Sequence, residues 1–329
     1  MTTARSEPGA APERADVVSV DAVRAAAAAG LPDRIAFLGF GLIGGSIALA
    51  LRAAGATAHL AAWTPAGDGP AAGAEYGVLD AAPRNPAVAL DGAGLVILAG
   101  PPMSVLDHLG HLGGPMRDRL AAGATITDVA STKAIIVARA EDLGLPFVGG
   151  HPMAGRETTG FGSATAELFI DRPWVVAAGD EASPRQLALV DDLAVAAGAR
   201  PVHMAALDHD LAVASISHLP LIASAALVES VADDTARWPA ALALAAGGWR
   251  DMTRLARGDA EMGGGIIATN ARPIADALRA YRDALDAWLV ELERLTDESR
   301  PALPQPADLE RVRARLAAAR AILHEEATR

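Results

Sequence analysis

The chain has 329 residues, of which 51% are hydrophobic, so it can form about two domains with cores of their own. Its net charge of −12 argues against nucleic acid and anionic membrane surfaces as partners. The absence of cysteine excludes disulfides and thiolate metal sites, and residues 1–30 carry no apolar secretory segment. These features predict a cytoplasmic protein that binds neither nucleic acid nor membrane and holds no metal.

The strongest local pattern is a strand, a glycine turn and a helix in direct succession. An apolar strand is expected at residues 35–39, and Gly39-x-Gly41-x-x-Gly44 follows at once. A helix rich in small and apolar residues is expected at 42–54. This order is the context that a dinucleotide-binding fingerprint requires, so the sequence predicts binding of NAD or NADP.

Each glycine of this motif suits a different task. Gly39 permits the tight turn, Gly41 lets the backbone approach a pyrophosphate, and Gly44 allows close packing of helix and strand. The free N–H groups at the helix start, near Leu42 and Ile43, are expected to face the phosphates. The competing interpretation is a glycine-rich turn with no ligand.

The choice between NAD and NADP stays open at this stage. The second strand, expected at 57–63, ends in Trp63-Thr64-Pro65, where no Asp or Glu is present to hold a ribose 2′-hydroxyl. No Arg stands there to hold a 2′-phosphate either. Thr64 and Pro101, which follows a strand at 95–99, are expected to contact the cofactor.

The remaining pattern divides the chain into three parts. Residues 1–33 are expected to form a flexible N-terminal arm with a short helix at 21–29. Alternating strands and helices over 34–204 predict a Rossmann-type, doubly wound and mostly parallel α/β sheet. Further strands are expected at 125–129, 147–148, 174–178 and 201–204.

Residues 205–329 show only helical patterns and are expected to form a substrate and dimerisation domain. The uncharged run at 211–228 is long enough to resemble a membrane span, but it contains His218, Pro220 and three serines. We therefore expect a helix that is buried in protein, packed against a second copy of the chain.

Three polar side chains follow strand ends and are expected to face one crevice. Ser131 and Lys133 follow the strand at 125–129, and His151 follows the strand at 147–148. Lys133 is the only lysine in the chain, and Asn85 and Asn270 are the only asparagines. Because lysine and asparagine occur nowhere else in this sequence, a specific role is favoured for these three residues.

The combination of motifs resembles the prephenate/arogenate dehydrogenase family of tyrosine biosynthesis over roughly residues 34–290. The matching motifs, in the family's order, are GxGxxGGS from Gly39, DxxSxK from Asp128, HPMAGxE from His151, SHLP from Ser217 and GxRDxTR from Gly248. The resemblance implies a homodimer with a Rossmann domain and a helical dimerisation domain. It also implies NAD(P)⁺-dependent oxidative decarboxylation of a cyclohexadienol.

The resemblance also implies roles for individual residues. His151 would accept a hydrogen bond from the 4-hydroxyl as hydride leaves, a task that suits a neutral imidazole, and Ser131 would help to orient that hydroxyl. Arg254 would bind a substrate carboxylate. Lys133 would face the crevice in a supporting role, and Glu157 would meet the substrate side chain or a neighbouring arginine. His218 is expected on the substrate side, against the alternative of a satisfied core histidine.

Two positions depart from the family pattern. Members that use prephenate often carry a histidine after SHLP, where this chain has Leu221. Many members carry a tryptophan nine residues after the carboxylate-binding arginine, where this chain has Gly263. Both changes are expected near the substrate side chain, so prephenate and arogenate stay open as substrates.

Three other functions compete with this assignment. A paralogue could act on 4-amino-4-deoxyprephenate, although His151 facing a 4-hydroxyl argues against it. A non-catalytic nicotinamide-binding regulatory protein would not need the Ser131, His151 and Arg254 set. A β-hydroxyacid dehydrogenase would be expected to carry a catalytic lysine in its helical domain, and this chain has none there.

Overall fold

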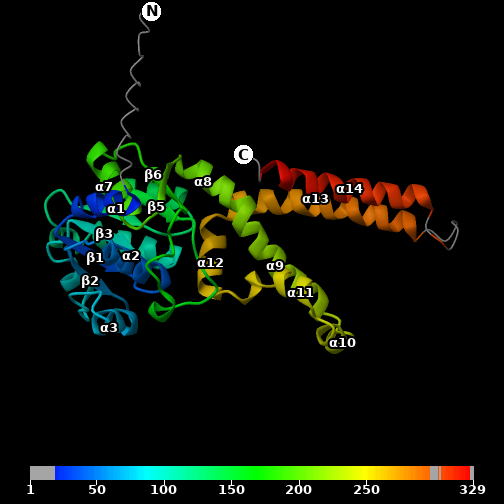
Figure 1. Ribbon diagram of the computed structural model, residues 1–329, viewed down its shortest axis with the longest axis horizontal. Helices are drawn as coiled ribbons and strands as arrows, with labels where there is room; N and C mark the ends of the chain where they lie inside the picture. Colours follow the sequence, from blue (N-terminus) through cyan, green and yellow to red (C-terminus); the bar gives the residue numbers. More distant parts are fainter. Residues whose placement is uncertain (1–18, 297–302, 304, 327–329) are drawn as a thin grey trace, which may run out of the picture. The chain divides into compact units, whose positions relative to one another are not determined.

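The computed structural model describes residues 19–296, 303 and 305–326, and it divides into two compact units, Met1–Ala271 and Arg272–Arg329. The first unit is built on a seven-stranded sheet with the strand order β2-β1-β3-β4-β5-β6-β7 (Figure 1). The strands are β1 (Arg34–Leu38), β2 (His59–Trp63), β3 (Leu95–Leu98), β4 (Thr125–Asp128), β5 (Phe147–Pro152), β6 (Pro173–Ala178) and β7 (Arg200–His203). The doubly wound α/β fold is thus confirmed.

Helices connect these strands and continue beyond the sheet. Those of the sheet region are α1 (Val20–Ala29), α2 (Leu42–Ala53), α3 (Asp68–Glu75), α4 (Pro86–Leu90), α5 (Pro102–Leu112), α6 (Ala134–Asp142) and α7 (Pro184–Ala196). Helix α7 begins at a capping box, in which the Ser183 side chain and the Gln186 side chain each bond the other residue's backbone. All strand pairs are parallel except β5 and β6, which are antiparallel.

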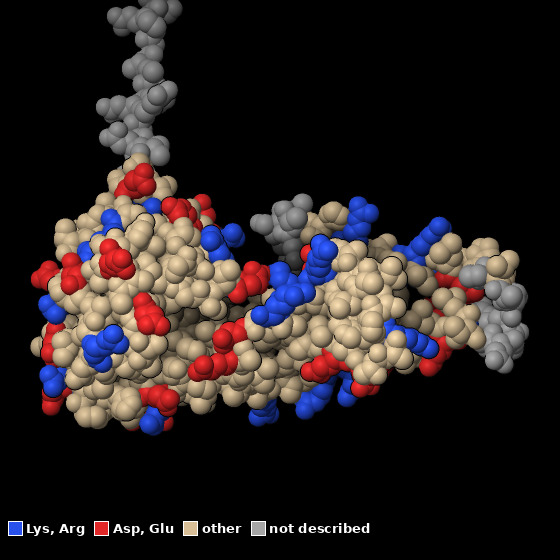
Figure 2. Space-filling model, turned by 90° about the horizontal axis from the view of Figure 1, so that it is seen from below, with Lys and Arg blue, Asp and Glu red and all other residues tan. Residues whose placement is uncertain are grey.

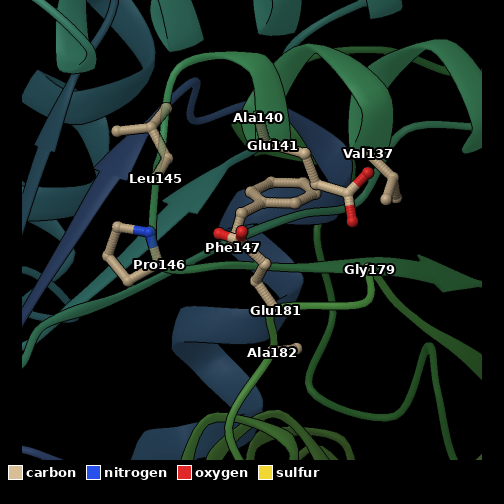
Figure 3. A pocket seen from close by; sticks show the side chains of 9 residues that line it. All are labelled: Val137, Ala140, Glu141, Leu145, Pro146, Phe147, Gly179, Glu181 and Ala182. Carbon is tan, nitrogen blue, oxygen red and sulfur yellow. The ribbon is translucent and has the colours of Figure 1, made fainter.

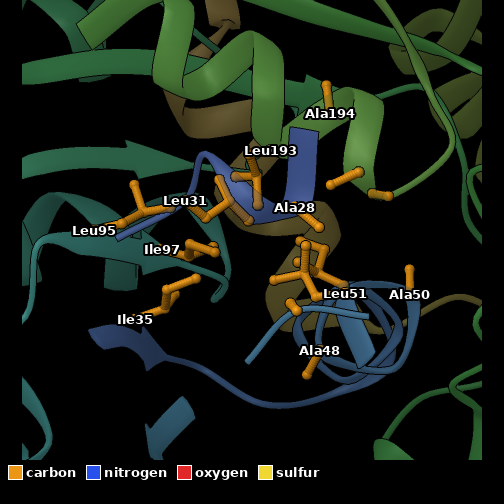
Figure 4. Packing of buried hydrophobic residues seen from close by; sticks show 14 of the residues in the cluster. Ala28, Leu31, Ile35, Ala48, Ala50, Leu51, Leu95, Ile97, Leu193 and Ala194 are labelled. Atoms are coloured by element: carbon orange, nitrogen blue, oxygen red, sulfur yellow. The ribbon is translucent and has the colours of Figure 1, made fainter. Parts of the chain in front are cut away.

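The sheet buries a hydrophobic core on each face, because alternate residues of a strand point to opposite sides. Ile35 and Phe37 of β1 lie in the core shared with α1, α2 and α7. Ala36 and Leu38 lie in the opposite core, which includes residues of α5 and α6. Figure 4 shows the first core at close range, where side chains of α1, α2 and α7 pack over β1 and β3.

The short helix expected at 21–29 is confirmed as α1, whereas residues 19–33 are packed against the sheet domain and not free as an arm. Ser19 caps α1 by accepting a hydrogen bond from Ala22 N at 3.2 Å. The helix packs against α7, with Ala27 and Ala28 buried between them, and Arg24 Nε donates to the Ala196 carbonyl at 3.3 Å. An apolar alanine stripe thus attaches this segment to the core, whereas residues 1–18 lie outside the described part of the chain.

The helical part of the first unit begins with one long, interrupted helix. Its parts are α8 (Ala206–Val213), a π-helical segment (Ala214–His218) and α9 (Leu219–Ala232), followed by α10 (Trp238–Ala243), α11 (Gly247–Met252) and α12 (Ala260–Thr269). Among the described residues, Ala206–Ala232 is the one helix long and apolar enough to span a membrane by length and composition, which is weak evidence of a span. Only 22% of its most apolar window is buried within this single chain, so most of that surface needs another partner.

The second unit consists of two paired helices, α13 (Ala271–Leu295) and α14 (Pro306–Glu326). Their contacts run in antiparallel register, since Arg311 pairs with Glu291 at 2.9 Å and Arg315 donates to the Ala287 carbonyl at 2.8 Å. The Arg315 guanidinium also lies 4.0 Å from the centre of the Trp288 ring. Charged and cation–π contacts therefore join the two helices along their length.

Candidate active site

A cleft of about 920 Å³ opens at the carboxyl ends of the central strands. Its size falls within the range of sites for cofactors and small ligands. Among the residues expected from the sequence, the following line it: Gly39, Gly41, Leu42, Ile43, Thr64, Pro101, Ser131, Glu157, His218 and Arg254. The cleft therefore brings the glycine turn together with side chains that lie more than 200 residues later in the chain.

The glycine turn has the shape that a pyrophosphate needs. Gly39 adopts a φ of +105°, and a Cβ there would lie 2.4 Å from the carbonyl carbon of Ala99, so a larger residue does not fit. Gly44 lies against Gly39 and Ala99, where a Cβ would be 2.8 Å from the Gly39 oxygen. A Cβ on Gly41, by contrast, would meet no atom closer than 4.0 Å, which leaves open space in front of α2.

The start of α2 supplies hydrogen-bond donors to that space. Gly41 is the N-cap of α2, and no side chain caps the helix. Its first N–H groups and the positive end of the helix dipole are therefore available to an anion. These features fit the pyrophosphate of NAD or NADP, and Leu42 and Ile43 are the residues that would present the donors.

His151 is the first member of a chain of three hydrogen-bonded side chains. Its Nδ1 lies 2.8 Å from Nε2 of His209, and Nδ1 of His209 lies 2.8 Å from Oδ1 of Asp210. Asp210 also accepts hydrogen bonds from the backbone N–H groups of Lys133 at 2.7 Å and Ala134 at 2.8 Å. The carboxylate therefore caps the N-terminus of α6 by accepting from its first backbone N–H groups.

These contacts determine which nitrogen of each ring carries the proton. Because the Asp210 carboxylate only accepts, Nδ1 of His209 donates to it, and Nε2 of His209 is left as an acceptor. Nδ1 of His151 must then donate to His209, which leaves the lone pair of the ring on Nε2. Burial, together with the neighbouring His209, Lys133 and His218, holds the pKa of His151 well below 6.5. His151 is therefore a neutral hydrogen-bond acceptor near pH 7.

His218 lies beside this chain, at the end of the π-helical segment. Its ring is 1% exposed, and Nδ1 lies 3.1 Å from Nδ2 of Asn270. Since the amide nitrogen can only donate, the ring proton of His218 is on Nε2, which is buried near the backbone of Ser131 without a well-formed hydrogen bond among the described residues. Burial lowers the pKa of His218 to about 4 despite the nearby Asp210. The residue is thus a neutral donor that lines the cleft.

Lys133 lies differently from the expectation that it faces the crevice. Its side chain is fully buried, and Nζ forms an ion pair with Oδ2 of Asp128, which is also fully buried. Burial lowers the pKa of Lys133 and the ion pair opposes that shift, since the carboxylate favours the charged amine. Asp128 accepts further hydrogen bonds from Gly150 N and Ala130 N, both at 3.0 Å. Asp128 therefore joins β4 to β5 and to Lys133 at the start of α6, and neither side chain of the ion pair is exposed.

Arg254 and Glu157 form an ion pair on the cleft surface. The hydrogen bond from Arg254 holds the pKa of Glu157 below its usual range. Of the two partners expected for Glu157, the structure shows the neighbouring arginine. Both side chains stay about half exposed, at 58% for Arg254 and 45% for Glu157, so a ligand can reach the guanidinium. An exposed pair of this kind contributes little to stability, so its exchange for a substrate carboxylate costs little.

Sequence reasoning assigned no particular role to four residues that the structure places around the candidate site: Asp128, His209, Asp210 and Asn270. Asp128 opens the DxxSxK motif and could have been identified as the partner of the sole lysine. Asn270 was noted for its rarity, and its amide joins the Asp210 carbonyl at 2.8 Å to the His218 ring. His209 and Asp210 carried no signal, because a His-Asp dipeptide on a helix is commonly a solvated surface.

A second cavity, much smaller than the cleft, lies under α6. Figure 3 shows Glu141 and Glu181 beside Phe147 and Pro146 at this place. Its volume of about 20 Å³ is room for about one water molecule. Among the described residues, no three side chains that could ligate a metal ion lie together.

The surface charge does not attract a cofactor by itself. Figure 2 shows acidic side chains interspersed with basic ones and broad areas that carry no charge. With a net charge of −12, the protein must bind an anionic cofactor through local groups. The N-terminus of α2 and Arg254 are such groups inside the cleft.

Comparisons with known proteins agree with this geometry. The family model for the nucleotide-binding domain of prephenate dehydrogenase matches residues 47–203, and the model for the dimerization domain of prephenate dehydrogenase matches residues 205–302. The prephenate dehydrogenase of Bacillus subtilis (strain 168) is 30% identical over 272 residues, which cover 80% of this chain and 70% of the relative.

Solved structures show the same fold. Arogenate dehydrogenase of Synechocystis is 30% identical with a TM-score of 0.69, and the match covers 88% of this chain and 99% of the other. Prephenate dehydrogenase of Aquifex aeolicus, solved in complex with hydroxyphenyl propionate and NAD⁺, is 23% identical with a TM-score of 0.75 over 88% and 98% of the two chains. Together with the dinucleotide-binding turn and the cleft, these matches show that the chain belongs to the prephenate/arogenate dehydrogenase family of NAD(P)-dependent oxidoreductases.

Proposed function

We propose that this protein oxidatively decarboxylates a 4-hydroxycyclohexadiene, either prephenate or arogenate, in the synthesis of tyrosine. The observation that carries the proposal is the chain from His151 through His209 to Asp210, which neighbours His218 of the cleft that also contains the dinucleotide-binding turn. A cyclohexadienol needs a neutral acceptor on its hydroxyl and a hydride acceptor on its carbinol carbon. The site supports both requirements.

His151 serves as the acceptor on the substrate. Its Nε2 lone pair receives the proton of the 4-hydroxyl as carbonyl character develops at the ring carbon. A bound nicotinamide would supply the hydride acceptor for that carbon. The carbon–carboxylate bond breaks, CO₂ leaves, and its electron pair completes the aromatic ring. His209 and Asp210 hold the imidazole in the required tautomer and stabilise the charge that forms on it.

The other lining residues hold the substrate in place. Arg254 offers a guanidinium that suits a carboxylate. When the substrate binds, Arg254 releases Glu157 and pairs with the substrate carboxylate instead. His218 presents an N–H from a buried position and is suited to donate to a substrate oxygen. Ser131 also lines the cleft, where its hydroxyl can orient the 4-hydroxyl and the nicotinamide.

The two departures from the family pattern face each other in the cleft. A Cβ on Gly263 would lie 3.6 Å from Cδ2 of Leu221, and both residues line the cavity. Glu261, next to them in the lining, forms no ion pair with another described residue. A free carboxylate beside an apolar patch suits the ammonium of an alanyl side chain better than a pyruvyl ketone, so arogenate is the favoured substrate.

The proposed assembly is a homodimer formed through the helical domain, residues 205–329. Support comes from the match to the dimerization-domain model over 205–302 and from the apolar surface of the Ala206–Ala232 helix. Its Leu207, Leu211 and Ile216 are 58%, 49% and 70% exposed in the single chain. Sedimentation velocity should give about twice the chain mass of 33.5 kDa; a monomer at micromolar concentration contradicts the proposal.

The direct test combines both substrates with both cofactors. Prephenate and arogenate are each incubated with NAD⁺ and with NADP⁺, and the absorbance of reduced nicotinamide is followed. Release of CO₂ and formation of 4-hydroxyphenylpyruvate or tyrosine identify the product. We expect turnover with arogenate to exceed that with prephenate, whereas no turnover in any of the four mixtures would remove the proposed function.

A further inference from the structure

Arg84 lies beside the turn that follows β2, although it stands 21 residues after Trp63, the last residue of that strand. In this fold the ribose 2′ position lies at the carboxyl end of β2, which here is Trp63-Thr64. The guanidinium of Arg84 lies beside the turn that follows, with Nη1 3.2 Å from the position of a Cβ on Gly67. The sequence placed no arginine at the end of β2, and the structure supplies one from another segment.

Several contacts hold the segment around Arg84 against the outer edge of β2. Ala81 pairs with Ala61 as a parallel bridge, and Asp80 accepts from Leu60 N at 2.7 Å. Arg52 forms a 2.6 Å ion pair with Asp80 and so ties the segment to α2. The Trp63 indole donates to the Arg84 carbonyl at 3.1 Å. The backbone of Arg84 is therefore fixed, while its exposed guanidinium forms no ion pair with any described residue.

Two neighbouring groups complete a set of donors at this turn. Thr64 lines the cleft, and its Oγ1 accepts a hydrogen bond from Gly67 N at 3.0 Å, which leaves its own O–H free to donate. Gly67 is the N-cap of α3 in a left-handed conformation, and no side chain caps that helix. The Arg84 guanidinium and the Thr64 hydroxyl therefore both lie at Gly67, the uncapped start of α3, and Thr64 and Pro65 line the cleft.

We propose that Arg84 binds a 2′-phosphate and gives this enzyme a preference for NADP over NAD. Such a phosphate carries two negative charges when fully ionised, and a guanidinium can bind it through two parallel hydrogen bonds. The inference concerns the cofactor end of the cleft and rests on the dinucleotide-binding turn, not on the identity of the substrate. The carboxylate that competes with this assignment is Asp68, which begins α3 at the same turn and would favour the ribose hydroxyl of NAD.

The test measures binding of fragments that differ only in the 2′-phosphate. Titration calorimetry is done with 2′,5′-ADP and with 5′-ADP, then with NADP⁺ and NAD⁺, all in the absence of substrate. We expect the 2′-phosphorylated member of each pair to bind at least 10-fold more tightly. Arg84→Gln should lose about 10- to 100-fold in affinity for the 2′-phosphorylated ligands, and affinity for 5′-ADP and NAD⁺ should stay within about 2-fold.

Three further variants separate the possible outcomes. Arg84→Lys keeps the charge without the fork and should lose less than Arg84→Gln. Arg139→Gln, on the exposed face of α6, removes the same charge away from the cleft and should change neither affinity. Tighter binding of 5′-ADP than of 2′,5′-ADP by the wild-type protein overturns the proposal, as does an NAD⁺ preference that Asp68→Asn abolishes. Because the readout is binding alone, these results hold whether or not the protein turns over arogenate or prephenate.

Discussion

Nδ1 of His151 and Nε2 of His209 lie 2.8 Å apart, with the two rings nearly perpendicular at 83°. The contact joins the end of β5 to α8, and Asp210 continues it to the N-terminus of α6. A base on a loop alone would be free to turn and to carry its proton on either nitrogen. The hydrogen bond to the buried His209 fixes both the orientation of the His151 ring and the nitrogen that carries its proton.

The first prediction concerns His151 itself. His151→Asn should lower kcat by about two to four orders of magnitude, which is the usual contribution of a positioned acid–base group. Binding of the nicotinamide cofactor, measured by calorimetry, should change little because the glycine turn is untouched. Near-normal turnover in this variant would refute the assigned role.

The second prediction separates a positioning residue from the base. His209→Phe keeps a ring in the same buried place but removes both hydrogen bonds. We expect kcat to fall by about 10- to 100-fold with KM nearly unchanged, because loss of an orienting partner typically has this size. Once His151→Asn is present, adding His209→Phe should cost little more, since the two act as one unit. His203→Phe, at the exposed end of β7, is the matched control. An additive double variant would show that His209 does not act through His151.

The third prediction tests the carboxylate site. Arg254→Gln should raise KM for substrate by about 10- to 100-fold, because a charge-assisted pair is lost, and should leave cofactor affinity unchanged. Arg250→Gln removes an exposed arginine of α11 that does not line the cleft, and it should leave KM within about 2-fold of the wild type. An equal increase of KM in both variants would show that the net charge of the protein, and not a contact of Arg254 with the substrate, determines KM.

The fourth prediction distinguishes two glycines of one motif. A Cβ at Gly41 meets open space, so Gly41→Ala should fold with a nearly normal melting temperature but lose at least 10-fold in cofactor affinity, since the methyl group occupies the path of the pyrophosphate. A Cβ at Gly39 would overlap Ala99, and the φ of +105° is strained for alanine, so Gly39→Ala should lower the melting temperature by several degrees. Melting curves and cofactor titrations of both variants check this. Wild-type cofactor affinity in Gly41→Ala would show that the dinucleotide does not approach this turn.

The fifth prediction concerns stability and pH. His218 has a pKa of about 4 in the folded protein and about 6.5 in an unfolded chain, so the unfolded chain binds the proton first as the pH falls. The stabilisation is therefore complete above pH 6.5 and is lost progressively between pH 6.5 and 4, by roughly 3 kcal/mol for this one residue. The lowered pKa of His151 acts in the same direction.

Chemical denaturation at pH 7.0, 6.0 and 5.0 measures this loss. His218→Gln should flatten the decline, whereas His203→Gln, at the exposed end of β7, should leave it unchanged. A decline that is just as steep without His218 would show that other groups cause it.

Local interactions within a few residues determined what the sequence could predict. The strand at β1, the glycine turn and α2 were predicted because each is specified by residues next to one another. The parallel strands followed from short apolar runs. The family motifs added Ser131, His151, His218 and Arg254, which the cleft brings together or places beside its lining.

Only the tertiary structure decided the contacts between distant segments. His151 and His209 are 58 residues apart, Lys133 and Asp210 are 77 apart, and His218 and Asn270 are 52 apart. No periodicity records such pairs, because each partner alone is an ordinary polar residue on a helix or loop. The antiparallel pairing of β6, the burial of Lys133 against Asp128 and the approach of Arg84 to β2 depend on packing in the same way. A polar side chain acquires its charge, tautomer and partner from the segments that exclude water around it, and those segments are brought together only when the chain folds.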